Sequence, residues 1–372
     1  MPLAVSPQPI SRRKTIAIAG GGTGGHVYPA LALFEALAAR GHELVYLGDP
    51  RRLEGRVVPA RGLPFHPVPA PQYPRSGLVA KARFAVSLLS SIWASRRLLK
   101  RLEVDMVVGV GGYISAPPIL AAATLRLPTA IHEANVTPGM ANRLCARVAS
   151  QVFLTYPATA ARLPGKAPRE VVGCPVQPRV LTGSADAARA RYGLSADRTT
   201  VLVVGGSLGA RAINQLAIAL ARSSDRRFQL LHVTGPKYID EVKAELGELP
   251  EGVVLIGYED KMPDTLAAAD LVLARAGSST LAELTVVGLP SVLVPSPNVT
   301  DNHQEDNARG LEAAGAAKVV LEQALDLDAA VRDIITLAND PTALAEMSEA
   351  ARKLGRPDTA ERMADVVERW LD

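Results

Sequence analysis

The sequence predicts an α/β protein of two Rossmann-like domains, each built on a parallel sheet. Three observations support this prediction. Short β-rich runs alternate with helix-length segments rich in Ala and Leu, a glycine-rich turn follows a strand in each half, and the two turns lie half a chain apart. A chain of 372 residues is also too long for one ordinary core, and a prior of about 150 residues per domain suggests two.

The expected strands follow one another in the order of a repeated βαβ pattern. In the first half they occupy residues 15–19, 43–47, 105–108, 129–132 and 152–154. In the second half they occupy residues 200–204, 229–233, 253–256, 271–274 and 291–294. The proline-rich segment 64–74 is expected to be an ordered loop, and segment 342–372 to be helical with a break at the Gly-Arg-Pro of 355–357.

The two halves of the chain repeat one pattern. IAIAGGGTGGHVYPALAL and VLVVGGSLGARAINQLAI each give a strand, a Gly-Gly-(Thr/Ser)-x-Gly turn and a helix. The Pro-punctuated segment 173–184 lies between them. This segment is therefore the expected domain boundary.

The composition is that of a globular protein in a reducing compartment. Hydrophobic residues make up 48% and charged residues 21%, and the formal net charge of +4 matters only where charges cluster. Cys145 and Cys174 cannot form a disulfide scaffold, and no CxxC motif is present. A reducing cytosol is therefore the simplest compartment to expect. The start, MPLAVSPQPISRRK, places its basic residues after the apolar ones, the reverse of a signal peptide, and no run of 18 apolar residues predicts a membrane span.

The glycine-rich turn at 20–25 is open to two functional interpretations. The helix that such a turn opens offers unpaired amides and a dipole to an anion. Gly20, Gly22 and Gly25 spell the GxGxxG motif, and Asp49 lies near the end of the second strand, where a dinucleotide-binding protein has an acid for the ribose. In this interpretation the chain would be a nicotinamide dehydrogenase. His26 favours another chemistry, because a neutral imidazole at the helix start could take a proton. A packing role for the glycines is the alternative, and the matching Thr23 and Ser207 of the two turns weigh against it.

The segment from 275 to 308 is rich in groups that recognise a nucleotide sugar. A Gly-Ser-Ser-Thr turn at 277–280 can cap a helix and hold phosphate, and Glu283, one helical turn after Ser279, suits the two hydroxyls of a ribose. DNHQEDNA opens the next helix with polar side chains that can bind sugar hydroxyls: Asp301, Asn302, His303, Gln304 and Asn307. A capping acid and a solvated helix start are the alternatives.

Six motifs occur in an order that resembles the MurG-type family of glycosyltransferases. They are GGGTGGHVYPALAL, VGVGGYISAP, IHEANVTPGMANR, VVGGSLGARAINQ, GYEDKMPDTLAAADLVLARAGSSTLAEL and DNHQEDNA. The family adds N-acetylglucosamine to undecaprenyl-pyrophosphoryl-N-acetylmuramoyl-pentapeptide, converting lipid I to lipid II for peptidoglycan. The resemblance thus implies a role in cell wall biogenesis, cell shape and cell division.

The resemblance implies the GT-B architecture, with two Rossmann-like domains facing across a cleft. We expect an acceptor-binding and membrane-facing domain at 1–177 and a UDP-sugar-binding domain at 178–345. Residues 346–372 are expected to return to the first domain as a C-terminal helix.

The family's site residues map onto matching motif positions of this sequence. The resemblance implies a donor site of Asn135, Ser207, Tyr258, Glu259, Ser278, Ser279, Thr280, Glu283, His303 and Gln304. It implies an acceptor site of Thr23, Gly24, Gly25, His26 and Tyr113. His26 is the expected general base toward the muramoyl C4 hydroxyl, which would attack the anomeric carbon from the face opposite UDP and invert its configuration.

No cofactor and no metal are expected, because helix N-termini and amides can stabilise the departing UDP. The Asp-x-Asp at Asp326 and Asp328 is expected to cap a helix. The sequence departs from the family at the domain junction, where Gln177 stands in place of an arginine that faces the nucleotide phosphates. Arg179, two residues on, is the candidate substitute.

A basic and apolar segment at 77–103 is the expected membrane contact. It carries six Lys and Arg residues and no acid before Glu103, and Leu78, Arg83, Phe84 and Trp93 are the residues we expect at an anionic lipid surface. An ordinary amphipathic helix with its apolar face in the core is the alternative.

The expected partners are UDP-N-acetylglucosamine, undecaprenyl-linked lipid I and the anionic membrane surface, with other cell-wall synthesis proteins as candidates and no nucleic acid. The expected location is peripheral, on the cytoplasmic face of the plasma membrane, which is the inner membrane of a cell with two. Three alternatives remain open: a GT-B transferase with another lipid acceptor, an NAD-dependent dehydrogenase, and a non-catalytic nucleotide-binding protein.

Overall fold

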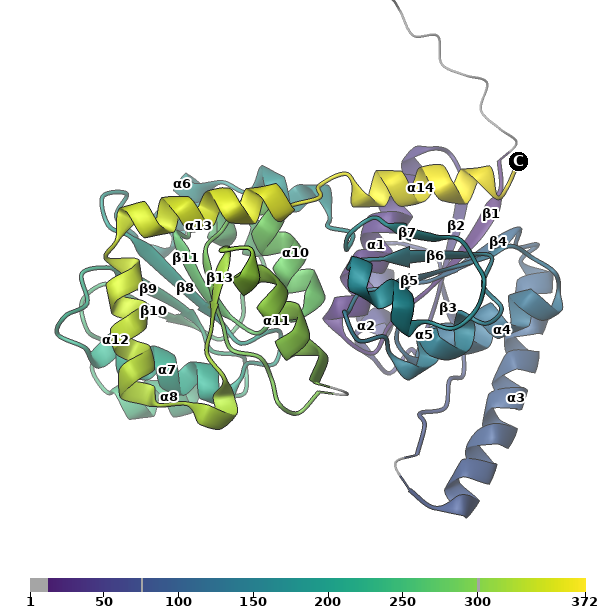
Figure 1. Ribbon diagram of the computed structural model, residues 1–372, viewed down its shortest axis with the longest axis horizontal. Helices are drawn as coiled ribbons and strands as arrows, with labels where there is room; N and C mark the ends of the chain where they lie inside the picture. The colour runs from purple at the N-terminus through teal and green to yellow at the C-terminus, as the bar shows by residue number, and fades with distance from the viewer. Residues whose placement is uncertain (1–12, 75, 300–301) are drawn as a thin grey trace, which may run out of the picture. The chain divides into compact units, whose positions relative to one another are not determined.

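The computed structural model describes residues 13–74, 76–299 and 302–372, and it divides into two compact units (Figure 1). Unit 1 takes its residues from Met1–Ala134, Pro138–Pro175 and Asp358–Asp372, and unit 2 from Asn135–Thr137 and Val176–Pro357. All strand pairs in both units are parallel. The prediction of two α/β domains with parallel sheets is confirmed.

Unit 1 is a seven-stranded sheet in the order β3-β2-β1-β4-β5-β6-β7. Its strands are β1 (Thr15–Ala19), β2 (Glu43–Gly48), β3 (Phe65–Pro67), β4 (Met106–Gly109), β5 (Thr129–Glu133), β6 (Gln151–Leu154) and β7 (Arg169–Val171). Its helices are α1 (Gly24–Ala39), α2 (Leu53–Ala60), α3 (Leu78–Arg101), α4 (Ala116–Thr124), α5 (Met140–Cys145) and α14 (Thr359–Arg369), with short 3₁₀ turns η1 (Tyr113–Ser115) and η2 (Pro157–Arg162).

Unit 2 is a six-stranded sheet in the order β10-β9-β8-β11-β12-β13. Its strands are β8 (Thr200–Val204), β9 (Gln229–Val233), β10 (Val253–Ile256), β11 (Leu271–Ala274), β12 (Ser291–Leu293) and β13 (Ala317–Val319). Its helices are α6 (Ala185–Tyr192), α7 (Arg211–Arg222), α8 (Ile239–Leu246), α9 (Met262–Ala267), α10 (Ser278–Val287), α11 (His303–Ala313), α12 (Leu327–Ala338) and α13 (Pro341–Leu354), with 3₁₀ turns η3 (Pro178–Thr182) and η5 (Glu322–Ala324).

Three short edge strands were not predicted from the sequence. β3, β7 and β13 are three residues each and lie at the edges of the sheets. β3 lies inside the proline-rich segment that we expected to be a loop. It forms because the exposed edge of β2 pairs with it, not because its own residues favour a strand.

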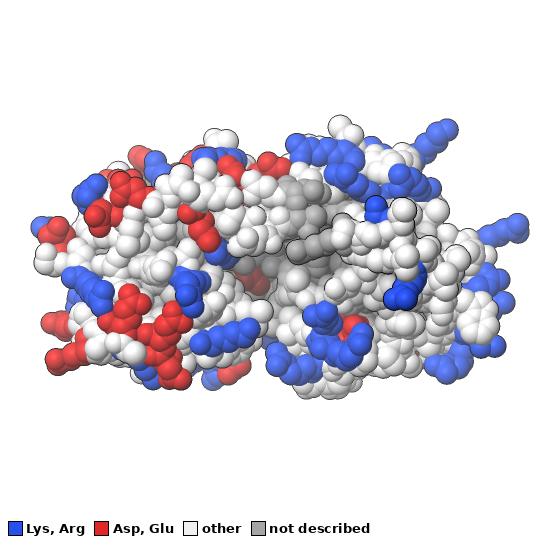
Figure 2. All heavy atoms as spheres, turned by 90° about the horizontal axis from the view of Figure 1, so that it is seen from below, with Lys and Arg blue, Asp and Glu red and all other residues white. Residues whose placement is uncertain are grey.

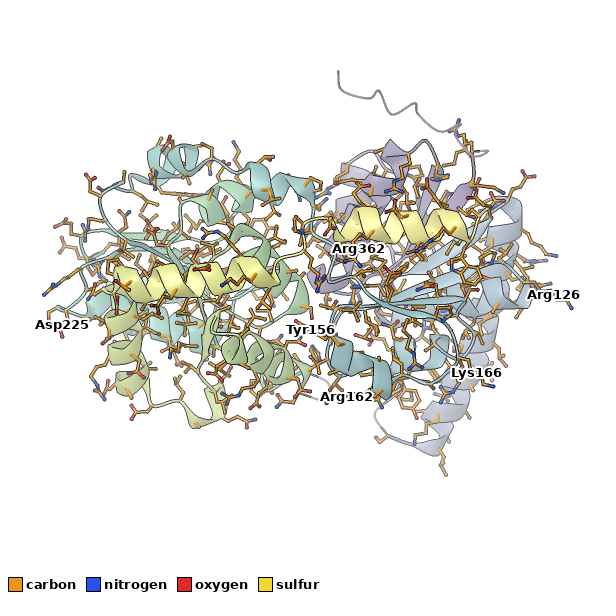
Figure 3. The ribbon with its side chains drawn as sticks, turned by 45° about the horizontal axis from the view of Figure 1, so that its top comes forward. Arg126, Tyr156, Arg162, Lys166, Asp225 and Arg362 are labelled. Atoms are coloured by element: carbon orange, nitrogen blue, oxygen red, sulfur yellow. The ribbon has the colours of Figure 1, made fainter. Side chains whose placement is uncertain are left out.

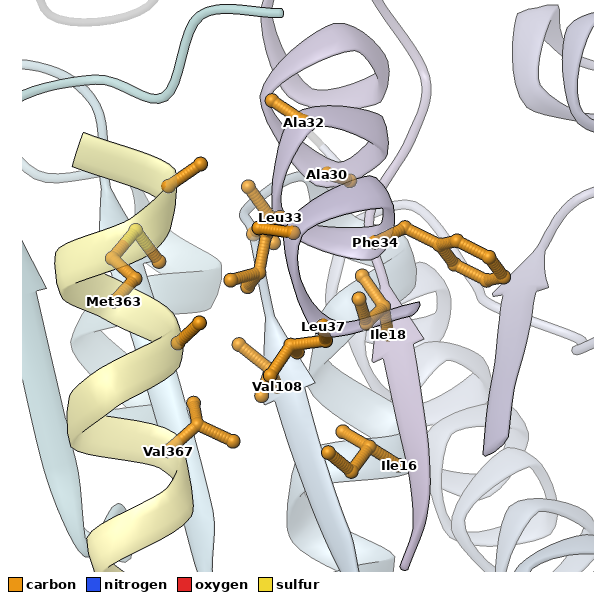
Figure 4. Packing of buried hydrophobic residues seen from close by; sticks show 14 of the residues in the cluster. Ile16, Ile18, Ala30, Ala32, Leu33, Phe34, Leu37, Val108, Met363 and Val367 are labelled. Carbon is orange, nitrogen blue, oxygen red and sulfur yellow. The ribbon is translucent and has the colours of Figure 1, made fainter. Parts of the chain in front are cut away.

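The C-terminal helix α14 completes the core of unit 1. Met363 and Val367 are fully buried and lie against α1 and the central strands (Figure 4). The Thr359 hydroxyl donates to the Val172 carbonyl at 2.8 Å, and Arg40 donates to the Glu368 carboxylate at 2.7 Å. Arg362, labelled in Figure 3, lies 3.4 Å from a carboxylate oxygen of Glu170 on β7. These contacts attach the chain end to unit 1.

The division of the chain differs from the expected one at two places. We expected 346–372 to return as one segment, but α13 stays with unit 2, where the Ser348 hydroxyl donates to the Gly288 carbonyl at 2.7 Å. Only residues from Asp358 on belong to unit 1. Residues Asn135–Thr137 also group with unit 2, although the strand before them belongs to unit 1.

Candidate active site

The first cluster of predicted site residues lies where the strand order of unit 1 reverses. β1 pairs with β2 on one side and with β4 on the other, so the loops that follow β1 and β4 leave from neighbouring strand ends. Ligands of open parallel sheets bind at such switch points. The GGGTGG turn and the Gly111-Gly112-Tyr113 segment therefore meet at the carboxyl ends of these two central strands.

His26 lies in the first turn of α1, between these two loops. The Thr23 hydroxyl oxygen is 3.2 Å from the His26 Nδ1 atom. On the other side the ring packs on Gly111, where an added Cβ would lie 2.6 Å from the ring Cδ2. The Tyr113 ring lies beside Gly22 in the same place. The structure thus brings together Thr23, His26 and Tyr113, which the sequence had placed 90 residues apart.

The start of α1 has the backbone geometry of an anion site beside His26. Thr23 is the N-cap residue with extended backbone angles, and Gly24 and Gly25 begin the helix. The first amides of a helix have no intrahelical acceptor, and the helix dipole adds positive potential. The amides of Gly24 and Gly25 can therefore receive phosphate oxygens without steric interference from side chains.

A second histidine lies behind His26 and is neutral. His132 on β5 is fully buried, and its Nε2 atom is 2.9 Å from the Gly173 carbonyl oxygen. Burial lowers the pKa of His132 to about 4, the hydrogen bond to Gly173 opposes this shift, and the neighbouring His26 adds to it. His132 is therefore a structural residue, and His26 is the histidine that stands at the strand ends.

Asp49 is not available for the ribose contact that a dehydrogenase needs. It is buried after β2, and both carboxylate oxygens accept hydrogen bonds from Arg51, one from Nε and one from a terminal nitrogen, each at 3.0 Å. The hydrogen bond from Arg51 holds the pKa of Asp49 below its usual range. An acid that is already paired in this way argues against the dehydrogenase interpretation.

The second cluster lies at the equivalent point of unit 2. β8 pairs with both β9 and β11, so the loops after β8 and β11 are neighbours. The first carries Ser207, whose side chain is exposed, and the second leads into α10 with Ser278, Ser279 and Thr280 in its first turn. Two predicted phosphate-binding segments are thus side by side.

The Ser278 hydroxyl already has hydrogen-bond partners within unit 2. It is buried and donates to the Asn135 side-chain oxygen at 3.0 Å, and it accepts from the Asn307 side chain at 3.1 Å. Asn307 also holds the Asn135–Thr137 segment, because its side-chain oxygen accepts the Val136 amide at 3.1 Å. Ser279 and Thr280 are partly exposed, so their hydroxyls and the helix amides are the groups of this turn that are predicted to bind phosphate.

Asn307, which the sequence indicated as a possible sugar-binding group, has a connecting role that the sequence did not show. The motif DNHQEDNA contains it, but nothing in the motif shows that a buried amide here joins α10 and the 135–137 segment. Asn135 was predicted as a sugar contact from the first domain. Its place within unit 2 is instead fixed by hydrogen bonds to Ser278 and Asn307.

Glu283 lies on α10 with an altered acidity. Its side chain is partly buried, and this burial raises its pKa to about 7, while nearby Arg179 acts in the opposite direction. Arg179 also donates to the Gln177 side-chain oxygen at 2.8 Å. The candidate substitute for the missing arginine is therefore close to the predicted ribose acid.

Tyr258 and Glu259 follow β10, and their two side chains differ. Tyr258 is exposed, whereas Glu259 is buried and accepts hydrogen bonds from the Tyr192 hydroxyl at 2.6 Å and the Lys261 amide at 2.7 Å. Burial and the bond to Glu259 raise the pKa of Tyr192 to about 12. Because the Glu259 carboxylate is occupied, only the backbone of this segment is suited to a uracil edge.

The polar start of α11 is partly described. His303 and Gln304 are partly exposed, and the Gln304 side-chain oxygen accepts the Ser296 amide at 2.9 Å. Asp301 lies outside the described residues. The Asp-x-Asp near the chain end caps a helix, as predicted, since Asp326 accepts the Ala329 amide at 3.0 Å. In the described ranges no three His, Cys, Asp or Glu residues are placed to hold a metal ion.

Helix α3 carries the predicted membrane residues on a mostly exposed surface. Leu78 is 86% exposed and Trp93 56% exposed, while Phe84 is half-buried and packs edge-on against Tyr73 at 5.1 Å between ring centroids. The Arg97 guanidinium lies 3.7 Å above the Trp93 ring. The alternative of a core helix is therefore wrong for most of its length.

The structure adds one observation to the expectation that no segment spans a membrane. Within 13–74, 76–299 and 302–372, one helix, α3, is long and apolar enough to cross a membrane by length and composition. Figure 2 shows Lys and Arg side chains, with few acids among them, on the face of unit 1 in that view, whereas unit 2 shows both signs of charge.

The raised pKa of Glu283 makes the folded chain less stable as the pH rises. The folded chain keeps the Glu283 proton to about pH 7, whereas the unfolded chain loses it near the ordinary value of 4.5. The free energy of unfolding therefore decreases as the pH rises through this window. Glu283→Gln should be more stable than wild type at about pH 8, by on the order of 1–3 kcal/mol, and equal to it below about pH 4, as measured by urea unfolding.

Asp264→Asn is the matched control with the opposite sign. A hydrogen bond from Arg191 holds the pKa of the Asp264 carboxyl below its usual range. Its stabilising contribution is therefore present above the unfolded-state pKa and is lost as the pH falls. If Glu283→Gln and Asp264→Asn changed the pH profile in the same direction, the effect assigned to Glu283 would be wrong.

Comparison with known proteins identifies the family. Residues 16–154 match the model of the glycosyltransferase family 28 N-terminal domain, and residues 200–363 match that of the glycosyltransferase family 28 C-terminal domain. A UDP-N-acetylglucosamine–N-acetylmuramyl-(pentapeptide) pyrophosphoryl-undecaprenol N-acetylglucosamine transferase of Clavibacter sepedonicus is 43% identical over 94% of this chain and 95% of its own length. The same enzyme of Desulforudis audaxviator is 38% identical over 95% of this chain and 98% of its own length.

Solved structures agree with this assignment. The crystal structure of Acinetobacter baumannii MurG is similar with a TM-score of 0.77 and 28% identity, covering 96% of this chain and 99% of that one. The glycosyltransferase of kitacinnamycin shares the fold, with a TM-score of 0.72 and 19% identity over 97% of this chain and 100% of that one. The resemblance to the MurG-type family is confirmed, and the chain belongs to glycosyltransferase family 28.

Proposed function

We propose that this protein is an inverting glycosyltransferase that moves N-acetylglucosamine from UDP-N-acetylglucosamine to the muramoyl C4 hydroxyl of lipid I, giving lipid II. The observation that carries the proposal is the pair of glycine-rich phosphate loops at equivalent switch points. One of them holds a histidine between Thr23 and Gly111, and the other lies beside Ser279 and the acid Glu283. The similarity to transferases of this name along nearly the whole chain supports the same reaction.

In this reaction the acceptor hydroxyl oxygen bonds to the anomeric carbon as the bond from that carbon to UDP breaks. UDP leaves with the electron pair of that bond, and the configuration changes from α to β. His26 takes the hydroxyl proton. If the Nδ1 proton is donated to the Thr23 hydroxyl, which lies 3.2 Å away, the Nε2 atom is left as the basic nitrogen.

Unit 2 supplies the donor site in this proposal. The amides at the start of α10, with Ser207, Ser279 and Thr280, receive the pyrophosphate and stabilise its charge as UDP departs. Glu283 accepts the ribose hydroxyls in its ionised form. The backbone at Tyr258 and Glu259 meets the uracil, and His303, Gln304 and Asn135 meet the sugar.

A transfer assay with a radiolabelled donor and a lipid I analogue tests the reaction directly. We expect transfer from UDP-N-acetylglucosamine and little from UDP-glucose or UDP-galactose. Calorimetry with UDP, UDP-N-acetylglucosamine and NADH separates the proposal from the dehydrogenase alternative. Preference for another UDP-sugar, for another lipid acceptor or for NADH would contradict the proposal.

Replacing His26 tests the base. His26→Ala should lower turnover by about 10²–10⁴-fold, because a positioned base contributes that much, while UDP affinity stays nearly unchanged. The matched control is His66→Ala on β3, a half-buried histidine outside the strand ends that carry the loops. The assignment fails if His26→Ala turns over like wild type, or if His66→Ala loses as much activity.

We also propose that α3 brings the enzyme to the membrane that holds its acceptor, as a peripheral protein on the cytoplasmic face. The exposed Leu78, Leu89 and Trp93 supply apolar area, and Arg83 and Arg97 supply positive charge beside it. Each cation near an anionic surface contributes about 1 kcal/mol. Phe84, which packs edge-on against Tyr73, adds a half-buried aromatic side chain to α3.

Charged substitutions on α3 test the membrane contact. Leu89→Glu with Trp93→Glu should reduce cosedimentation with anionic vesicles at least about tenfold, because both side chains are exposed and the change adds repulsion to lost apolar area. Leu249→Glu, at an exposed leucine of unit 2, is the control and should bind as wild type does. Unchanged binding of the α3 variant would refute this role.

A further inference from the structure

A buried carboxyl group lies behind the first glycine loop, and neither the proposed mechanism nor the predicted site uses it. Glu54, in the first turn of α2, has no exposed surface. Its Oε2 atom accepts the Gly22 amide at 3.0 Å, and its Oε1 atom accepts the Asp49 amide at 3.2 Å. Among the described residues Glu54 has no ion pair with a Lys, Arg or His side chain, so its charge is met by backbone amides.

Two glycines leave room for the Glu54 side chain, because a side chain at either position would collide with it. A Cβ atom on Gly21 would lie 2.3 Å from the Glu54 Oε1 atom, and one on Gly48 would lie 2.6 Å from its Cγ atom. The loop after β1 and the end of β2 therefore both fit closely around this one side chain. These two close approaches fix where the Glu54 carboxyl group lies, which ordinary close packing alone would not do.

Glu54 determines which amides of the loop face outward. The Gly22 amide points inward to the carboxylate, with Gly22 at a φ of +87°, and the next residue is Thr23. The amides of Gly24 and Gly25 at the helix start are then the ones left for an anion. The buried Tyr46 hydroxyl donates to the Gly20 carbonyl at 2.8 Å and fixes the other end of the turn.

We propose that Glu54 is a positioning residue for the transfer reaction: by holding the Gly22 amide it sets the loop that presents Thr23, His26 and the helix amides to the pyrophosphate and hydroxyl of the lipid acceptor. This inference rests on the proposed function for its acceptor. The Glu54 side chain itself does not touch substrate.

Glu54→Gln tests the inference because the side chain keeps its shape while one acceptor oxygen is replaced by an amide NH2 group. This NH2 group is a donor and would face a backbone N–H that has lost its acceptor. We expect kcat/KM for the lipid I analogue to fall about tenfold to a hundredfold, the range for losing one buried hydrogen bond to a charged group. The KM for UDP-N-acetylglucosamine should stay within about twofold of wild type, because unit 2 is unchanged. Glu35→Gln, an exposed acid on α1, is the matched control and should behave as wild type.

Amide hydrogen exchange gives a readout that does not depend on activity. The Gly22 amide should exchange at least about tenfold faster in Glu54→Gln, while amides of β1 keep their wild-type rates. Gly21→Ala disturbs the same contact from the loop side, because its Cβ atom would lie 2.3 Å from the Glu54 Oε1 atom. It serves as the test if Glu54→Gln does not fold, and the Gly22 amide should again exchange faster. Wild-type exchange at Gly22 in a folded variant would overturn the inference, whether or not the wild type transfers sugar.

The two proposals fail in different ways. If wild type transfers the sugar and Glu54→Gln keeps its acceptor kcat/KM, the positioning role is wrong and the proposed function stands. If wild type does not transfer the sugar but Gly22 exchange responds, the loop contact stands and the proposed function is wrong. An equal loss for donor and acceptor would mean general destabilisation and would also overturn the positioning role.

Discussion

The close approach of the loops after β1 and β4 is the constraint on which the site of unit 1 depends. A Cβ atom on Gly112 would lie 2.4 Å from the Gly21 carbonyl oxygen, and one on Gly111 would overlap the His26 ring. Parallel pairing of β1 with β4 brings these loops to one edge, and the two glycines let them touch. Close backbone contact therefore holds the His26 imidazole on the side of Gly111.

Unit 2 uses the same backbone arrangement with different side chains. A Cβ atom on Gly209, in the loop after β8, would lie 2.2 Å from the Thr234 carbonyl oxygen, so this loop is also held by close backbone contact. It presents the exposed Ser207 at the motif position that Thr23 holds in unit 1, and Ala210 occupies the motif position of His26. Two copies of one scaffold thus place a glycine-rich loop at the same point of each sheet, and the loop of unit 1 is followed by a histidine. The difference between donor and acceptor chemistry lies in a few residues and not in the fold.

Patterns within short stretches of sequence predicted the strands and the residues next to them. The ten predicted strands exist because long apolar runs are buried in parallel sheets, and Thr23 and His26 were found because they adjoin such a run. β3 was missed because its pairing with β2 forms it. The hydrogen bond between Ser278 and Asn135 was missed for a related reason, since the two residues lie 143 positions apart and no periodicity connects them. Contacts between distant segments are what one sequence does not show.

Glu54 is the clearest case of such a hidden contact, and energetics explain why its role concerns geometry. A glutamate in the first turn of a helix usually stabilises that helix by a few tenths of a kcal/mol from an exposed position. Burying a carboxylate costs several kcal/mol, and two amide donors at about 1.5–3 kcal/mol each do little more than offset this. A leucine at this position would bury more apolar area but would leave the amides of Gly22 and Asp49 without these acceptors. The carboxyl group therefore contributes little net stability, and its main effect is one defined conformation of the loop.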